Sequence, residues 1–329
     1  MPTMKRIAQI FLIACVMLVS SGPVYSQEQN QSTAETTSRD DLAKLLARLD
    51  QNPSIDRAYA AFQRGYYLTA FTFALKEAVG GDDHAQTLLA EIYANGLGIP
   101  RDISKAIDWY SLAAAQSNGH AQFSLGLMHS SGNGLEKDLA KAAEFFKLAA
   151  DNGIAAAQHN LGIMYLTGQP LKRDVNQAVI WFEKAADQGD MDAQYALALI
   201  YKDGPQGFKD ENRAFVFMFE SAQAGHLDAQ VELALMLFRG RGVEPDPRRA
   251  SRWFIQAANS GHVIAQNRIA RMYARGLGVP LNPVEAYKWH LIAQSAGYSD
   301  TWLDTFVSGL KPSAIEKSLQ KSRDWLAWR

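Results

Sequence analysis

Small and apolar residues recur along the chain at a fixed interval of 36 residues. Each copy begins with the pair Ala-Gln, and an apolar residue, a small residue and two further large residues follow the alanine at offsets 4, 5, 7 and 8. These offsets lie on one face of an α-helix. The pattern therefore predicts six helices with one buried face each, whose alanines stand at 85, 121, 157, 193, 229 and 265.

A second helix is predicted in every copy. A glycine near the end of the first helix can take the left-handed conformation that stops it, and an aspartate or asparagine six residues later can cap the next helix. A further glycine closes each copy except where Ser117 stands, and there we expect Gly119 to supply the turn. The predicted caps of the second helices are Asp102, Asp138, Asp174, Asp210, Asp246 and Asn282.

The repeats predict an all-α fold. A single helical hairpin cannot bury its own apolar face, so six copies over residues 85–300 are expected to stack as an α-solenoid of antiparallel helix pairs. Residues 41–84 predict an N-terminal helix and a partial capping repeat. Residues 301–329 predict a C-terminal capping helix that follows Lys311-Pro312, with Trp325 and Trp328 available to cover the last repeat.

The first 26 residues carry the pattern of a secretory signal peptide. Two basic residues precede an apolar run of about 13 residues, shorter than the roughly 20 that a membrane-spanning helix needs. We expect cleavage before Gln27, then a flexible polar tether over residues 27–40 and no membrane span. The motif Leu-Ile-Ala-Cys that ends at Cys15 also resembles a lipoprotein signal, so a lipid anchor stays an alternative. Either signal predicts an exported protein, periplasmic or secreted.

Composition argues against several classes of function. The chain has 329 residues, with 33 Lys+Arg against 34 Asp+Glu, so it lacks the basic excess of a general nucleic-acid binder. We therefore predict no nucleic-acid partner. The one cysteine lies in the predicted signal segment, which leaves no disulfide or zinc-thiolate site in the mature chain.

Residues that can carry chemistry follow the repeat instead of clustering. His84 and His120 share one repeat position and His226 and His262 share another, which favours structural roles in the turns over metal binding. His129 replaces a Tyr or Leu of the buried face, and we expect it to hydrogen-bond within the stack. The Gly-x-Gly pairs end helices and lack the lysine of a P-loop. No Gly-x-Ser-x-Gly motif is present, and no Ser-x-x-Lys occurs together with the partner motifs of serine β-lactamases. The sequence predicts no metal, cofactor or catalytic residue.

These columns resemble the Sel1-like repeat of the tetratricopeptide-like superfamily. Its pattern runs A-x-x-x-L-G-x-x-Y-x-x-G-x-G, then a capping Asp, then K-A-x-x-W-Y/F-x-K-A-A and a Gly; residues 157–189 match it closely and the resemblance covers about residues 53–300. The resemblance implies a right-handed stack of helical hairpins that acts as a scaffold or adaptor, often in bacterial envelopes. It implies no shared catalytic site, although some exported members are associated with β-lactam binding or hydrolysis.

Partner binding is expected where the repeats differ, because the shared positions form the core. On the first helices, offsets 2, 6 and 9 from the alanine point away from the buried face and carry apolar residues in the central repeats. Two interpretations stay open: this run binds a partner, or it packs between neighbouring repeats. The candidate residues are Phe123, Leu127, Tyr195, Leu199, Val231 and Phe238.

Basic residues gather in the last two repeats. Residues 239–289 carry a net charge of +6, whereas residues 27–238 carry −10. Such a gradient can orient an anionic partner, although a solvated charged surface explains it as well. We expect the double variant Arg271→Glu with Arg275→Glu to weaken partner capture at an unchanged melting temperature. The basic candidates are Arg239, Arg268, Arg271 and Arg275.

We therefore expect a periplasmic or secreted scaffold that holds a segment of an envelope protein in its concave groove. Two alternatives stay open. One is an enzyme that acts on β-lactams or peptidoglycan, and the other is a lipid-anchored envelope assembly factor.

Overall fold

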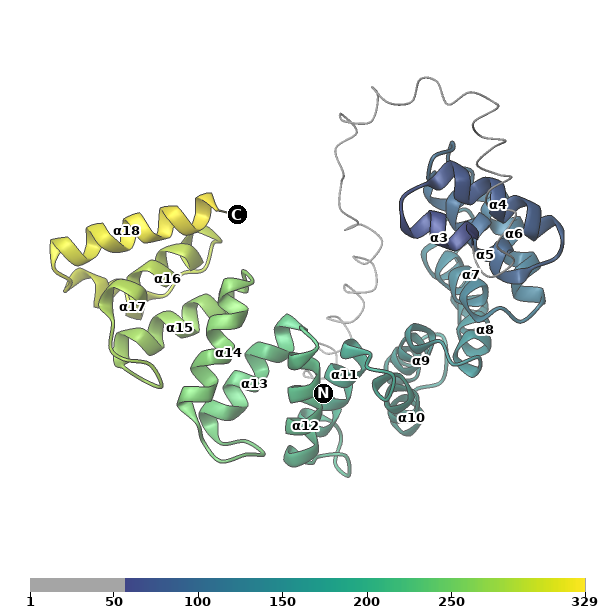
Figure 1. Cartoon of the computed structure of the whole chain (residues 1–329). Helices are drawn as coiled ribbons and strands as arrows, with labels where there is room; N and C mark the ends of the chain where they lie inside the picture. The colour runs from purple at the N-terminus through teal and green to yellow at the C-terminus, as the bar shows by residue number, and fades with distance from the viewer. Residues whose placement is uncertain (1–56, 329) are drawn as a thin grey trace, which may run out of the picture. The chain divides into compact units, whose positions relative to one another are not determined.

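The computed structural model describes residues 57–328, and every regular element there is a helix (Figure 1). Consecutive helices pack in pairs, which confirms the predicted all-α solenoid. The helices belong to two compact units, whose boundary falls within α10 (Val175–Ala186). The predicted signal peptide, Cys15, the tether and the helix predicted before residue 52 lie outside the described residues.

The first unit, described from residue 57 to Trp181, opens with a partial repeat. Two helices, α3 (Arg57–Gln63) and α4 (Tyr67–Val79), pack together ahead of the first full repeat. Its remaining complete helices are α5 (Asp83–Asn95), α6 (Ile103–Ala115), α7 (Gly119–Ser131), α8 (Leu139–Asp151) and α9 (Ala155–Thr167).

The second unit holds the later repeats and the C-terminal end. Its repeats contain α11 (Met191–Asp203), α12 (Glu211–Gln223), α13 (Leu227–Arg239), α14 (Pro247–Asn259), α15 (Val263–Arg275) and α16 (Pro283–Ser295). Two further helices follow, α17 (Thr301–Ser308) and α18 (Pro312–Ala327), and both pack on α16.

The C-terminal end has a helix after Lys311-Pro312, where the sequence predicted one, and also a short helix before it that was not predicted. Asp300 caps the short helix α17, and Pro312 then begins α18. Trp325 packs edge-on against Trp289, with ring centroids 5.8 Å apart, and so covers the last repeat. Trp328 is 90% exposed and covers nothing, so that part of the prediction is wrong.

The Ala-Gln pair that marks each repeat has two structural roles. The alanine is buried in every copy. The glutamine donates from Nε2 to the carbonyl oxygen eight residues earlier, at the end of the preceding second helix, over 3.1 to 3.5 Å. In the fifth repeat, Gln230 donates in this way to Ala222. The pair therefore links each repeat to the helix before it. The sequence pattern predicted where the pair lies but not the hydrogen bond that the glutamine makes.

The turn after each second helix contains a residue in the left-handed backbone conformation. In six of these turns the residue is a glycine, with φ between 84° and 103°. Ser117 occupies the same position and itself adopts a φ of 69°. Gly119 begins α7 instead, so the prediction that it supplies the turn is wrong. The glycines are Gly81, Gly153, Gly189, Gly225, Gly261 and Gly297.

Side chains cap the second helix of every repeat and all but one of the first helices. The predicted Asp and Asn caps of the second helices are confirmed, because each accepts a hydrogen bond from a backbone N–H in the first turn. The first helices α5, α7 and α11 are capped by Asp82, Asn118 and Asp190, whereas α9 follows Ile154 and has no side-chain cap. In the fifth and sixth repeats, the Nδ1 atoms of His226 and His262 accept the bond instead. These two histidines therefore have structural roles in the turns, as predicted.

His129 departs from its predicted role. Its ring stacks on Phe145 with centroids 5.6 Å apart, and its Nδ1 atom is buried without a hydrogen-bond partner. Stacking therefore replaces the hydrogen bond that the sequence suggested.

Within residues 57–328, no helix is both long enough and apolar enough to span a bilayer.

Candidate protein-binding surface

Arginines line the first helices of the last two repeats. Arg268, Arg271 and Arg275 lie on one face of α15, because residues three, four and seven apart align along a helix. Ala265 and Ile269 of the same helix are fully buried, which turns the arginines outward. Arg239 ends α13 at the repeat position that Arg275 occupies on α15. The second unit therefore brings the four basic candidates onto two first helices that share one hydrophobic core.

Arg271 is paired within the chain. Its Nε and Nη2 atoms donate to the two carboxylate oxygens of Asp300 at 2.6 and 2.7 Å, and Asn267 donates to the same carboxylate at 2.5 Å. Asp300 also accepts from the backbone of Trp302 and Leu303 and so caps α17. The Arg271 guanidinium and these donors hold the pKa of Asp300 well below its usual range.

The Arg271–Asp300 pair changes the expectation that the variant Arg271→Glu with Arg275→Glu keeps its melting temperature. Reversing the charge of Arg271 removes the partner of a carboxylate whose side chain is only 4% exposed, so the variant should lose stability as well as binding. Arg271 is therefore unsuited to a binding test. Sequence reasoning missed Asp300 and Asn267, although an aspartate just before an amphipathic segment is a helix-start signal.

The other three arginines have no carboxylate partner among the described residues. The Arg275 guanidinium lies over the indole of Trp302, 4.3 Å from its centroid, and this contact orients the cation without neutralising it. Arg268 is half-buried, and its Nε atom is shielded from water without a hydrogen-bond partner. Arg239 is exposed at the end of its helix. These three charges are free to meet an anionic group.

A nearby acid does not cancel them. Glu232 of α13 stands one repeat before Arg268, at the same repeat position. Its carboxylate accepts a 2.5 Å hydrogen bond from Lys202 of α11, a side chain that is only 10% exposed. Lys202 also lies 3.3 Å from the carboxylate of Asp203, so both acids are paired with a lysine of α11 and neither is paired with an arginine of the last repeats.

The apolar candidates of the second unit are mostly packed inside it. Tyr195, Leu199 and Val231 are buried, and the Tyr195 ring stacks on His226 with centroids 4.3 Å apart. Phe238 is half-buried against the core that α13 shares with α15. Packing within the stack therefore accounts for the three buried side chains, which offer almost no surface to a partner.

In the first unit, Phe123 and Leu127 of α7 are half-buried. Both pack against the core formed around Phe146, and the Phe123 and Phe146 rings lie 5.7 Å apart. Gly126 lies between them in sequence, and an added Cβ atom there would come within 2.7 Å of the Phe146 ring. The outer edges of Phe123 and Leu127 remain candidates for partner contact.

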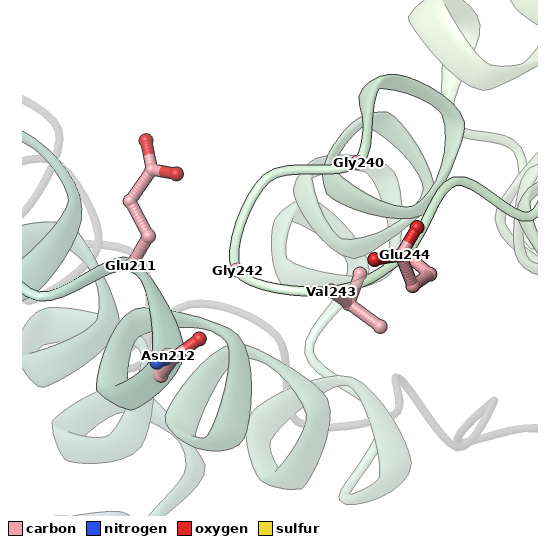
Figure 2. A pocket seen from close by; sticks show the side chains of 6 residues that line it. All are labelled: Glu211, Asn212, Gly240, Gly242, Val243 and Glu244. Carbon is pink, nitrogen blue, oxygen red and sulfur yellow. The ribbon is translucent and has the colours of Figure 1, made fainter.

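A shallow depression of about 490 Å³ lies between the start of α12 and the loop after α13. Figure 2 shows Glu211 and Asn212 on one side and the segment from Gly240 to Glu244 on the other. Glu211 is already paired with Arg241 at 2.9 Å. The depression is thus open and polar, and its lining includes no nucleophile paired with a base.

One group of described residues brings three metal-ligating side chains together, namely Asp82, Asp83 and His84. Asp82 caps α5 by accepting from the Ala85 backbone, and Asp83 accepts from Asn118. These protein donors account for the arrangement of the two carboxylates, so the group carries no argument for a bound metal.

The six copies match a known family model, the Sel1 repeat, at residues 83–118, 119–154, 155–190, 192–226, 227–262 and 263–298. These matches cover well over half of the chain. The chain belongs to the Sel1-repeat family.

Solved Sel1-repeat structures show the same fold. A Sel1 repeat protein from Oxalobacter formigenes is 33% identical, with a TM-score of 0.66 over 73% of this chain and 98% of that one. A protective antigen of uropathogenic Escherichia coli with an SLR fold is 25% identical, with a TM-score of 0.69 over 86% of this chain. The match spans 63% of the length of that antigen. No curated protein matches the chain in sequence.

Sel1-repeat proteins generally act as protein–protein interaction scaffolds. In this chain, Arg239, Arg268, Arg271 and Arg275, which we call the arginine surface, stand at positions where the Sel1 repeats differ. At the repeat position of Arg268 no two copies carry the same residue, whereas the Ala-Gln pair is invariant. The shared residues thus make the stack, and this unshared position gives the last repeat its charge. The six residues are Leu88, Ser124, Asn160, Ala196, Glu232 and Arg268.

Proposed function

We propose that this chain is an exported scaffold, periplasmic or secreted, that holds a segment of an envelope protein against the first helices of its last repeats. The observation that carries the proposal is the set of unneutralised arginines Arg239, Arg268 and Arg275 on α13 and α15. Charges that have no partner inside a fold are available for a partner outside it.

Export rests on the N-terminal sequence pattern, which predicts a signal peptide and leaves a lipid anchor on Cys15 as the alternative. Mass spectrometry of the mature N-terminus distinguishes cleavage before Gln27 from lipidation of Cys15.

Partner capture tests the scaffold itself. The tagged chain is crosslinked in the envelope fraction of its own organism, purified and compared with the double variant Arg239→Glu, Arg275→Glu. We expect wild type to enrich a specific protein and the variant to lose it while staying folded, because neither side chain pairs with a carboxylate in residues 57–328 and losing the Arg275–Trp302 contact costs only about 1 kcal/mol. Failure of the wild-type chain to enrich any protein would reject the scaffold.

A matched control separates position from total charge. Arg248 and Arg252 are exposed on the second helix α14 and lie outside the arginine surface. The variant Arg248→Glu, Arg252→Glu has the same net charge as the test variant, so it should capture the partner as well as wild type does. Equal loss in both variants would mean that only overall charge matters.

A further inference from the structure

The three arginines of α15 differ in whether a carboxylate of the chain pairs with them, and this difference defines a site. Arg271, at the centre, is fixed by Asp300, whereas Arg268 and Arg275 on either side have no anionic partner in the described part of the chain. The centre of the surface is therefore neutral and rigid, and its two ends are positive.

Both end charges are preorganised. The Nε atom of Arg268 is buried, so its guanidinium is partly removed from water, where an incoming carboxylate is attracted more strongly than at a fully solvated site. Trp302 holds the guanidinium of Arg275 against its indole face and leaves the N–H groups at the edge of the guanidinium free. Little side-chain entropy is left to lose on binding.

The spacing of these charges specifies a ligand. Arg268 and Arg275 are seven residues apart, which corresponds to roughly 10 Å along a helix. A polyproline II segment rises about 3.1 Å per residue with three residues per turn, so acidic residues three positions apart face the same side at roughly 9 Å. An extended chain with the pattern acid-x-x-acid therefore matches both cations.

Resting on the proposed scaffold function, we propose that α15, assisted by Arg239 of α13, binds an extended acidic polypeptide segment whose carboxylates are three residues apart. Nucleic acid fits less well, because three free arginines neutralise few phosphates and the chain as a whole carries a net charge of −1. Bidentate pairing of each guanidinium with one carboxylate gives the site its preference for a peptide.

Fluorescence anisotropy of the full chain with a fluorescein-labelled peptide of repeated Glu-Pro-Pro tests the proposal. We expect saturable binding that falls about tenfold or more in Arg268→Gln with Arg275→Gln, because two charge-assisted contacts are lost. The matched variant Arg248→Gln with Arg252→Gln should bind as wild type does, and a Gln-Pro-Pro peptide should not bind. The single variant Arg239→Gln, at an exposed helix end, should weaken binding even if the double variant folds poorly.

Several outcomes would overturn the inference. Equal affinity in the two double variants, equal binding of the glutamine peptide, or tighter binding of a single-stranded oligonucleotide or of anionic phosphatidylserine vesicles would each exclude an acidic peptide site. The scaffold hypothesis and the peptide-site hypothesis can be rejected independently. Capture of a partner that is unaffected by Arg268→Gln with Arg275→Gln rejects the site alone, whereas peptide binding without any captured partner rejects the scaffold.

Discussion

At the scale of single residues, repetition imposes backbone conformations that the local residue does not favour. Ser117 is the one described non-glycine residue with positive φ, and it stands where six other turns have glycine. The left-handed region costs a residue with a Cβ atom about 1 kcal/mol or more. The stacking of the flanking helices α6 and α7 therefore overrides a local preference.

Ser117→Gly should raise the free energy of unfolding by about 1 kcal/mol, because glycine adopts this φ without a steric penalty. The reverse change, Gly153→Ser, should lower it by a similar amount, since a Cβ atom there would meet nothing within 4 Å and only the backbone conformation is altered. Urea denaturation measures both. Unchanged stability in both variants would show that these turns relax freely.

A histidine cap makes the fifth repeat sensitive to pH. The Nδ1 atom of His226 accepts from the Ala229 backbone at 3.2 Å, which requires an unprotonated nitrogen. Burial lowers the pKa of His226, and it outweighs the attraction of Asp192 and Asp228. Below about pH 6.5, the imidazole of His226 is therefore protonated less readily in the folded chain than in the unfolded chain.

Because the folded pKa of His226 is depressed, stability should be intact near neutral pH and fall as the pH drops below about 6.5. His226→Asn keeps a capping oxygen, as Asn118 provides on α7, and removes the titration. Urea denaturation at about pH 7.5 and about pH 5.5 should show a smaller loss for the variant than for wild type. A loss of equal size would assign the pH dependence to other groups.

At the scale of helices, the glutamine of each Ala-Gln pair is satisfied differently in the two units. In the first unit, the Oε1 atoms of Gln86 and Gln122 accept from Gln116 and Asn152, each 30 residues later, at 2.9 Å. In the second unit, the Oε1 atoms of Gln194, Gln230 and Gln266 are buried without a partner. The equivalent donors there are replaced by Ala224, Ser260 and Ala296.

Ala224→Gln should supply the missing donor to Gln194 and raise the free energy of unfolding by about 1 kcal/mol, the usual net value of a buried hydrogen bond. Ala224→Met, which adds similar length without a donor, serves as the control and should give no such gain. Urea denaturation of the two variants measures the difference. Equal effects of Gln and Met would show that the gain, if any, comes from packing.

Helix positions and caps were predictable from the sequence because they depend on neighbours within one turn of the chain. Asp102, for example, caps a backbone N–H only three residues away. Contacts between distant segments were not predictable. Arg271 meets Asp300 across 29 residues, and nothing in the repeat pattern pairs them. Tyr195 looked outward by helical periodicity but packs against His226 of the next repeat.

At the scale of the whole molecule, six copies of one hairpin divide the residues into two sets. The invariant columns supply the buried alanines and the glutamine ties, so they are committed to the stack. The variable positions carry the net charge of +6 over residues 239–289 within a chain whose total is −1. This division separates the positions that build the stack from those that are available to a partner.

Site-specific photo-crosslinking tests the central claim that the partner contacts the first helices of the last two repeats. The crosslinking amino acid is placed at Ile264 on α15, one turn before Arg268 on the same face, and, in a separate chain, at Val216 on the second helix α12; both positions are exposed. We predict that the captured partner crosslinks to position 264 and not to position 216. Crosslinking of that partner to position 216 and not to position 264 would contradict the account.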